Sequence, residues 1–454
     1  MRMYYSTNRK SPHVSFREAL LAGLAPDKGL YMPVEIPQLN RETLEVMEEL
    51  PYSEIAYLVL RQFLEGEIPD DELLELVKDA YTYPVPLEHV TERTYVMRLD
   101  QGPTASFKDF AARMMGRLMN YYLTRDRGKL CILTATSGDT GSAIANAFYG
   151  LDHIEVIILY PKDEVTPSQR KQMTTLGRNI TVLSVDGKFD DCQALVKQAF
   201  SDDELTSLSL SSANSINIGR LLPQSVYYFY SWAKLRNDPG EQPLFVIPSG
   251  NFGNMMGSVI AQRMGLPVSQ LIIATNENDE FPRFHHSGAY AKVSPSRNCI
   301  SSAMNVGHPS NLARLVDLFG GRMDEQGNVS ISPDLEAMRS LIKAVSVSDA
   351  QTKQAIRDAW DRYGLLLEPH GAVGWAALEQ CPETALTSAG ESRLRILLET
   401  AHPAKFPEQI KEVLSLEVEV PPSLAGLDTL EEHVISIKNS YGAFKDLLLK
   451  RRGA

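Results

Sequence analysis

The stretch Leu130-Cys-Ile-Leu-Thr-Ala-Thr-Ser-Gly-Asp-Thr-Gly141 decides the fold class, because a short apolar run passes directly into a turn of small and hydroxyl residues. Residues 130–134 are predicted to form a buried strand and residues 139–149 the helix that follows. The same unit recurs downstream, with strands predicted at 154–160 and 180–185 and helices at 167–176 and 190–200. Such alternation is typical of parallel strands covered by helices on both faces, so we predict an open α/β domain.

A second alternating region follows the loop at residues 209–217. It has helices predicted at 221–235, 254–264, 350–363 and 372–380, and strands predicted at 244–248, 271–275 and 395–400. Before both regions, residues 44–64 and 71–81 have the apolar spacing of amphipathic helices. We therefore predict three domains: a helix-rich N-terminal domain (1–95), a smaller α/β domain (96–205) and a larger α/β domain (206–454). Residues 276–332 are rich in loop-forming residues and receive no element, and the tail from Pro421 is expected to add a linker and one helix.

Composition excludes several classes of protein. The chain has 454 residues, of which 43% are hydrophobic and 22% charged, as in globular domains with buried cores. A net charge of -12 argues against a binder of nucleic acids or anionic membranes. The chain lacks a signal peptide and any long apolar run, and its four cysteines are scattered, so we expect a cytoplasmic protein. His285-His286 lacks the spacing of metal ligands, and no metal is predicted.

The motif Gly102-Pro-Thr-Ala-Ser-Phe-Lys-Asp-Phe-Ala-Ala-Arg113 contains the first candidate for chemistry. If Ser106 is the N-cap, Lys108 lies in the first turn of a helix, where the positive end of the helix dipole disfavours a second positive charge. That field lowers the pKa of an amine, which suits a lysine acting as nucleophile or base. The alternative is an exposed Lys108 paired with Asp109.

Two other motifs lie between a predicted strand and a predicted helix. In residues 134–141, hydroxyls and backbone N–H groups suit a carboxylate or phosphate, although the turn could also be a simple helix cap. In Pro248-Ser-Gly-Asn-Phe-Gly-Asn254, Gly250 and Gly253 allow positive φ and let backbone N–H groups approach a phosphate closely. The alternative is a tight turn, and the spacing does not fit the dinucleotide-binding pattern.

The fourth motif is Thr400-Ala-His-Pro-Ala-Lys-Phe406, after a predicted strand. The hydroxyl of Thr400 could meet a ring nitrogen, although a structural threonine is the alternative. Together, a tuned lysine, a phosphate loop, an anion-binding turn and a terminal hydroxyl are the parts needed to hold pyridoxal 5′-phosphate.

On these residues the chain resembles the threonine synthase family, in its branch of short bacterial and fungal chains within the fold-type II pyridoxal-phosphate enzymes. The resemblance runs from about Tyr4 to about Val420, and its motifs keep the family's order and spacing. The motifs are Val14-Ser-Phe16, Gly29-Leu-Tyr-Met-Pro33, Gly102–Phe110, Thr134–Ala143, Ser212-Ala-Asn-Ser-Ile-Asn217, Pro248–Asn254 and Thr400–Phe406. The resemblance implies two open twisted α/β domains with the cofactor in the cleft, beside the helix-rich N-terminal domain.

The resemblance also implies roles for single residues. Lys108 would form the Schiff base with the cofactor and act as the catalytic base, and Thr400 would meet the pyridine nitrogen. The cofactor phosphate would be held by Gly250, Asn251, Phe252, Gly253 and Asn254. Asp139 stands where the wider fold type commonly has an asparagine facing the cofactor's phenolic oxygen, and a carboxylate there needs a proton or a cation beside it.

By the same resemblance, the substrate is O-phospho-L-homoserine, which water converts to L-threonine and phosphate. Its carboxylate would bind at Thr136, Ser137 and Thr140. Its phosphate would meet Asn214 and Arg220, because a guanidinium fork matches phosphate oxygens. The family branch also implies a monomer.

Three rival functions are considered. The nearest is a serine or threonine dehydratase, or a phospho-lyase that yields a 2-oxo acid, and Asn214 with Arg220 would discriminate it because a dehydratase binds no substrate phosphate. A catalytically silent relative would be expected to lack Lys108 or the phosphate loop, and both are present. A nicotinamide dehydrogenase is disfavoured by the missing dinucleotide pattern.

Overall fold

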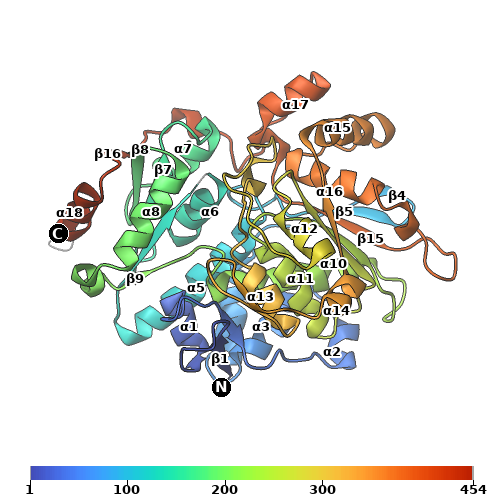
Figure 1. The fold of residues 1–454 in the computed structure, drawn as a ribbon, viewed down its shortest axis with the longest axis horizontal. Coiled ribbons are helices and arrows are strands. Elements are labelled where there is room, and N and C mark those ends of the chain that lie inside the picture. Colours follow the sequence, from blue (N-terminus) through green and yellow to red (C-terminus); the bar gives the residue numbers. More distant parts are fainter. Residues whose placement is uncertain (1, 137, 452–454) are drawn as a thin grey trace.

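Two mainly parallel sheets organise the chain, and the computed structural model describes residues 2–136 and 138–451. The smaller sheet has five strands in the order β16-β8-β7-β6-β9, and each neighbouring pair is parallel. Its strands are β6 (Leu130–Ala135), β7 (Ile154–Pro161), β8 (Ile180–Asp186), β9 (Leu210–Ser211) and β16 (Ile435–Lys438). This sheet lies on the left in Figure 1. Strands β6 and β7 are almost wholly buried, as their apolar runs predict.

The larger sheet has six strands in the order β14-β11-β10-β15-β5-β4. Its strands are β4 (Leu87–Thr91), β5 (Thr94–Arg98), β10 (Leu244–Pro248), β11 (Gln270–Thr275), β14 (Ile342–Ser346) and β15 (Arg395–Glu399). Only β4 runs antiparallel to its neighbour; the other pairs are parallel. The carboxyl ends of β10 and β15 therefore open at the same edge of the sheet, and both lead into predicted site motifs.

Helices cover both sheets and connect their strands. Those of the smaller sheet are α5 (Lys108–Asp126), α6 (Asp139–Phe148), α7 (Pro167–Thr174), α8 (Phe189–Phe200) and α18 (Tyr441–Arg451). Those of the larger sheet include α9 (Ile218–Leu221), α10 (Val226–Leu235), α11 (Gly253–Arg263), α15 (Asp349–Tyr363), α16 (Pro369–Glu379) and α17 (Pro407–Leu414). Among them, α16 packs against β10, β11 and β15.

The N-terminal segment is not only helical. Strands β1 (Met3–Ser6), β2 (Val14–Ser15) and β3 (Tyr31–Pro33) form a small antiparallel sheet. The helices are α1 (Phe16–Ala22), α2 (Arg41–Val46), α3 (Tyr52–Leu64) and α4 (Asp70–Ala80). The continuous helix predicted at 44–64 is wrong, because Pro51 fixes an extended conformation before α3 and separates it from α2.

The segment 276–332, which received no predicted element, contains short pieces of structure. They are α12 (Glu280–Ser287), α13 (Leu312–Leu318), β12 (Arg322–Met323) and β13 (Val329–Ile331), followed by α14 (Leu335–Leu341). Hydrogen bonds from Asn311 to the backbone of Asn251 join this segment to the loop after β10.

An aromatic cluster fixes the helix that begins at Lys108. The ring of Phe110, on the first turn of α5, lies 5.4 Å from the ring of Tyr52 on α3 and 5.9 Å from that of Tyr227 on α10. All three residues belong to a buried core that extends from the N-terminal helices into both sheets. Burial of such rings contributes about 2–3 kcal/mol each, so the first turn of α5 is firmly placed.

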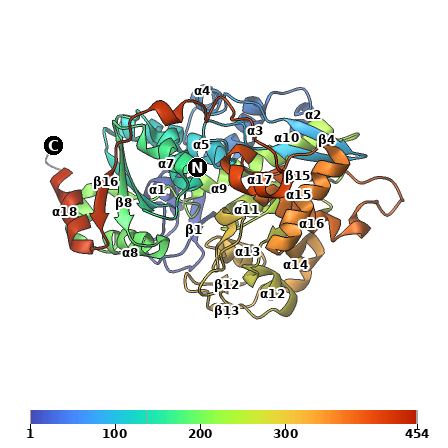
Figure 2. The same cartoon turned by 90° about the horizontal axis from the view of Figure 1, so that it is seen from above.

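The division of the chain at residues 95 and 205 stays a prediction, to which the strand pairing adds two facts. Strands β4 and β5 lie in the six-stranded sheet, so residues 87–98 join the larger α/β unit. Strand β16 extends the five-stranded sheet, and Figure 2 shows it with α18 at the outer edge of that sheet, beside β8 and α8. The chain's tail thus returns to the smaller sheet. Within the described ranges, no helix combines the length and apolarity that a bilayer crossing requires.

Candidate active site

Lys108 is the first residue of α5, as expected, but the helix is capped differently. Phe107 occupies the N-cap position and makes no side-chain cap, so the prediction of Ser106 as N-cap is wrong by one residue. The backbone of Ser106 instead bridges Ala401, the residue after Thr400. Asp109 accepts hydrogen bonds from the backbone N–H of Thr104 (2.8 Å) and from its hydroxyl (2.6 Å). The alternative of a surface pair between Lys108 and Asp109 therefore does not describe this lysine.

The amine of Lys108 lies inside the protein and faces the carboxylate of Asp139, the first residue of α6. Its Nζ lies 3.5 Å from Oδ2 of Asp139, and only 14% of the side chain is exposed. Burial lowers the pKa of Lys108; nearby Asp139 opposes that shift, whereas Lys405 and Arg220 add to it. The predicted direction of the shift is thus present, with desolvation as its main cause.

Asp139 has two cationic neighbours and one amide donor. Its Oδ1 lies 2.6 Å from Nζ of Lys405 and accepts a 2.9 Å hydrogen bond from Nε2 of Gln169. Burial alone would raise the pKa of Asp139, but the charges of Lys405 and Lys108 lower it below its usual range. Asp139 therefore has the cationic partners that a carboxylate at this position was expected to need.

Lys405 is the residue that the motif analysis missed. Its side chain is fully buried, and its Nζ also donates a 3.0 Å hydrogen bond to the carbonyl of Thr104. One signal was available: a lysine between the apolar residues Ala404 and Phe406, just after a strand. A lysine in such a setting is seldom buried without a partner, but the sequence does not say which carboxylate it meets.

The turn after β6 is held by hydrogen bonds between its own residues. The hydroxyl of Thr136 accepts hydrogen bonds from the backbone N–H groups of Gly138 (3.0 Å) and Gly141 (2.8 Å). Gly138 has φ of 138°, which a side chain would disfavour, and a Cβ there would lie 2.4 Å from the Gln169 side chain. Thr140 is partly exposed on the first turn of α6, and Ser137 lies outside the described residues.

The loop after β10 contains the residues predicted to bind the cofactor phosphate, and its left-handed residue is not a glycine. Neither Gly250 nor Gly253 takes a positive φ; the left-handed residue is Phe252, at 62°. Gly250 is required for another reason, because a Cβ there would lie 2.9 Å from the carbonyl oxygen of Ala303 and 3.0 Å from Cα of Met304. At Gly253, the first residue of α11, a Cβ would lie 3.1 Å from Nε2 of Gln224.

Two buried polar atoms at this loop have no hydrogen-bond partner among the described residues. They are Oγ of Ser249, at the end of β10, and Nδ2 of Asn254, in the first turn of α11. Asn254 is held by the hydroxyls of Tyr227 (2.9 Å) and Tyr228 (2.6 Å), which both donate to its Oδ1. Asn251 is exposed, and its backbone carbonyl accepts a 2.8 Å hydrogen bond from Asn311. Unsatisfied donors at a helix N-terminus suit an anionic group.

Thr400 lies at the end of β15 and beside two buried carboxyl groups. Its hydroxyl lies 3.4 Å from Oε1 of Glu368, the N-cap of α16. Glu399, also buried, accepts a 2.8 Å hydrogen bond from the backbone N–H of Glu368. Burial and the charge of Glu368 raise the pKa of Glu399 well above its usual value. Two buried carboxyl groups so close together favour a proton on Glu399, although Arg98, at 3.6 Å, opposes this.

Glu368 also links Thr400 to the predicted phosphate loop. Its Oε2 accepts from Nδ1 of His370, and Nε2 of His370 accepts a 3.0 Å hydrogen bond from the backbone N–H of Ala303. Since Ala303 is the residue that packs on Gly250, a continuous path of contacts joins the two motifs.

Arg220 and Asn214 are the residues predicted to bind the substrate phosphate, and Arg220 lies close enough to Lys108 to act on it through its charge. Arg220 is 4% exposed, and its Nη1 donates a 2.7 Å hydrogen bond to the carbonyl of Ala213, while its Nε is buried without a partner. Among the described residues it forms no ion pair, and burial lowers the pKa of Arg220 to about 10. Asn214 accepts a hydrogen bond at Oδ1 from the hydroxyl of Thr134, which turns its NH2 group away from that contact. A buried, unpaired guanidinium is costly unless an anion completes it.

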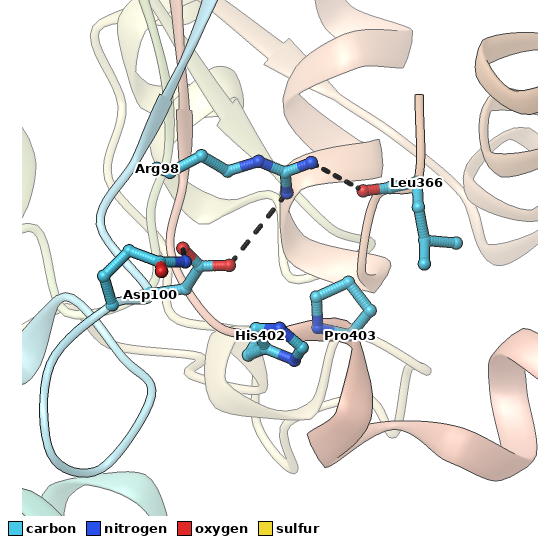
Figure 3. Close-up of a pocket in the computed structure, with 6 residues that line it drawn as sticks. Arg98, Asp100, Leu366, His402 and Pro403 are labelled. Carbon is cyan, nitrogen blue, oxygen red and sulfur yellow. Dashed lines mark hydrogen bonds and ion pairs between the residues drawn. The ribbon is translucent and has the colours of Figure 1, made fainter. Parts of the chain in front are cut away.

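A separate cavity of about 230 Å³ lies beside this centre (Figure 3). It is lined by Arg98, Asp100, Gln101, Leu366, His402 and Pro403, none of which is a predicted site residue. In Figure 3, Arg98 reaches from β5 toward Asp100 on one side and the carbonyl of Leu366 on the other. The cavity therefore adjoins the turn after Thr400 but is not the predicted cofactor site.

Family models match this chain from residue 3 to residue 448. Residues 81–393 match the family model described as "Pyridoxal-phosphate dependent enzyme", residues 3–81 the model "Threonine synthase N terminus", and residues 371–448 the model "Threonine synthase, C-terminal". The threonine synthase of Haemophilus influenzae is 38% identical over 450 residues, covering 98% of this chain and 99% of its own.

Solved structures agree with these matches. The structure titled as threonine synthase from Brucella melitensis with bound pyridoxal phosphate superposes with a TM-score of 0.92 at 36% identity and covers 100% of both chains. The structure of threonine synthase from yeast superposes with a TM-score of 0.90 at 32% identity over 99% of each chain.

Proposed function

Because the chain belongs to the threonine synthase family of pyridoxal-phosphate-dependent enzymes, we propose that it converts O-phospho-L-homoserine and water to L-threonine and phosphate. It is a lyase of this family, and its cofactor is pyridoxal 5′-phosphate. The identity of the substrate and the roles of single residues are the parts that we propose.

The residues present fit the cofactor. The unpartnered Ser249 hydroxyl and Asn254 amide, with the backbone of Gly250–Gly253 at the start of α11, suit its phosphate group. Lys108 offers a buried amine for covalent attachment, and the Thr400 hydroxyl is available to the ring nitrogen. When bound, the cofactor supplies an electron-withdrawing ring that stabilises negative charge on the carbons of an attached amino acid.

Lys108 is the residue to which we assign proton transfer. A lowered pKa raises the fraction of neutral amine, so Nζ can accept the proton from the substrate's α carbon and return it at a later step. No other lysine except Lys405 is placed near Asp139 in the described chain, and Lys405 is held by that carboxylate.

The substrate's two anionic groups are assigned to two different places. Its carboxylate would bind at the turn after β6, on Thr140 and the N-terminal turn of α6, whose shape the Thr136 hydroxyl maintains. Ser137, which precedes Gly138 in the chain, belongs to the same proposed site. The substrate phosphate would meet Arg220 and the NH2 group of Asn214.

The unpaired guanidinium of Arg220 is the observation that supports a phosphorylated substrate. It is buried, it lies close enough to Lys108 to lower the pKa of that amine, and no described carboxylate pairs with it. A serine or threonine dehydratase handles no phosphate ester and would have no use for such a charge. This favours threonine synthesis over the dehydratase alternative.

The test is a product assay on the pure protein with the cofactor and O-phospho-L-homoserine. Phosphate, threonine and 2-oxobutanoate are followed together, and equal release of phosphate and threonine is expected. Phosphate with 2-oxobutanoate but without threonine would identify a phospho-lyase. No phosphate release would reject the substrate.

We further propose that the enzyme works as a monomer in the cytoplasm. Its four cysteines are buried and lie far apart in the sequence, which suits a reducing compartment. Light scattering at micromolar concentration should give a mass near 50.5 kDa, and a mass twice as large would contradict the monomer.

A further inference from the structure

We propose that Lys405 is a positioning residue that neutralises the carboxylate of Asp139 and thereby allows the amine of Lys108 to be uncharged. The proposal rests on the proposed function, in which Lys108 must act as a neutral amine. It assigns a task to a buried lysine that the four motifs did not select.

Two lysines contact the carboxylate of Asp139, and their distances from it differ. Lys405 lies 2.6 Å from Oδ1 of Asp139 and has a second acceptor, the carbonyl of Thr104, at 3.0 Å. Lys108 lies 3.5 Å from Oδ2. Lys405 is therefore the better hydrogen-bonded ammonium group, and Lys108 the amine that can lose its proton at least cost.

The charge balance of the site leads to the same assignment. If both lysines were protonated, two ammonium groups would share one carboxylate in a buried site, with Arg220 adding a third positive charge. The other charged or titratable groups that face Lys405 are Asp109, on the first turn of α5, and His402, on its own segment. Asp109 acts on Lys405 and on Arg220 only through its charge, from a distance, and its oxygens bond to Thr104. Asp139 is the described carboxylate that contacts the lysine amines directly, and so it is their counterion.

Removal of Lys405 would reverse this arrangement. Asp139 would then have Lys108 as its only close ammonium partner, and the ion pair would hold the Lys108 amine in its protonated form. The direction of the pKa shift of Lys108 supports the argument, because Lys405 lowers that pKa and Asp139 raises it.

The experiment measures how fast the full-length, cofactor-free protein captures pyridoxal phosphate covalently, as a function of pH. Only the neutral amine reacts, so the pH dependence of the absorbance change reports the protonation of Lys108. A Lys108→Ala protein identifies the part of the signal that comes from this residue. The assay contains no O-phospho-L-homoserine, so a failure of the proposed substrate leaves its result unaffected.

We expect Lys405→Met to capture the cofactor about tenfold or more slowly at pH 7 than the wild type and to regain speed at high pH. The double variant Asp139→Asn/Lys405→Met removes both charges and should recover to within about threefold of the wild type. Lys405→Arg keeps the positive charge, so its rate of cofactor capture at pH 7 should lie between the rates of Lys405→Met and of the double variant. Lys411→Met, on the exposed helix α17 where Lys411 pairs with Glu417, is the matched control and should match the wild type.

The pH profile separates this role from a structural one. A poorly folded variant would capture the cofactor slowly at every pH, and the loss of a second residue would not restore it. Identical profiles for Lys405→Met and the wild type would overturn the proposal. Should Lys405→Met fail to fold, Lys405→Gln takes its place, because it removes the charge and keeps an N–H donor for Asp139. It should capture the cofactor slowly at pH 7 and regain speed at high pH, and a wild-type profile would overturn the proposal.

Discussion

The backbone N–H of Phe107 donates a 2.9 Å hydrogen bond to the carbonyl oxygen of Thr400 and so joins the start of α5 to the end of β15. Next to it, Ser106 bridges Ala401, and the N–H of His402 donates a 3.0 Å hydrogen bond to the carbonyl of Ala105. The main chain alone therefore holds the predicted cofactor-binding lysine and the predicted ring-nitrogen hydroxyl together. Side-chain replacements at Lys108 and Thr400 should leave this frame in place.

Lys108→Ala should abolish the covalent cofactor signal and lower turnover by at least about a thousandfold, because general-base and nucleophilic roles are lost together. Absorbance spectroscopy and threonine formation measure the two effects. The exposed Lys411→Met is the control. A Lys108→Ala protein that kept both the absorbance and the turnover would reject the assignment of Lys108.

Arg220→Lys should raise the KM for O-phospho-L-homoserine by about tenfold to a hundredfold, because a lysine cannot reproduce the guanidinium fork on a phosphate. Initial rates over a range of substrate concentrations measure the change. Arg41→Ala, in an exposed pair with Glu45, serves as the control.

Binding of L-threonine, which carries no phosphate, discriminates a substrate role for Arg220 from general damage. Titration of the cofactor absorbance should give the same affinity in Arg220→Lys and in the wild type. Equal weakening of threonine and of O-phospho-L-homoserine would contradict phosphate recognition by Arg220.

Gly250→Ala should weaken cofactor binding by at least about tenfold, because the new methyl group would overlap the Ala303 carbonyl and displace the loop. Equilibrium dialysis of the cofactor measures the dissociation constant. Gly442→Ala is the matched control, since nothing lies within 4 Å of a Cβ there and a helix favours alanine over glycine. Unchanged affinity in Gly250→Ala would mean that the loop does not hold the phosphate.

The buried carboxyl group of Glu280 should make the stability of the folded protein depend on pH. It is buried at the start of α12 with Oε2 lacking a described partner, and burial raises the pKa of its carboxyl to about 8. The folded state therefore holds this proton more tightly than the unfolded chain does. The contribution of Glu280 to the free energy of unfolding is therefore present in full below the pKa of the unfolded chain, near 4.5. It is lost as the pH rises toward about 8.

Glu280→Gln, which imitates the protonated acid, should accordingly change little at pH 4.5 and stabilise the protein by about 2–4 kcal/mol at pH 8.5. Urea denaturation at the two pH values gives the difference. Glu336→Gln, on the first turn of α14 and outside the buried set, is the control. A benefit of equal size at both pH values would show that Glu280 is not protonated in the folded protein.

Much of the fold could be predicted because the signals are local. The apolar runs that form β6, β7, β8, β10, β11 and β15 are short and bounded by turn residues, so their burial can be predicted from the sequence alone. The strands that were missed, such as β14 and β16, are less apolar on their own, and they form because a neighbouring strand offers backbone partners. Such pairing depends on residues far away in the chain.

Some features of the candidate site could likewise be predicted from the sequence, and others depend on the tertiary structure. The sequence by itself determined the family, the cofactor, the place of Lys108 in the first turn of a helix and the strand-turn-helix setting of the loop at 250–254, because each motif is a run of residues with a local chemical meaning. Only the tertiary structure could bring Lys405 to Asp139, bury Arg220 without an ion-pair partner among the described residues, and give the positive φ to Phe252 rather than to a glycine. Those features follow from which elements pack together. Charge and desolvation act through space over a few ångströms, and the order of residues along the chain does not encode that distance directly.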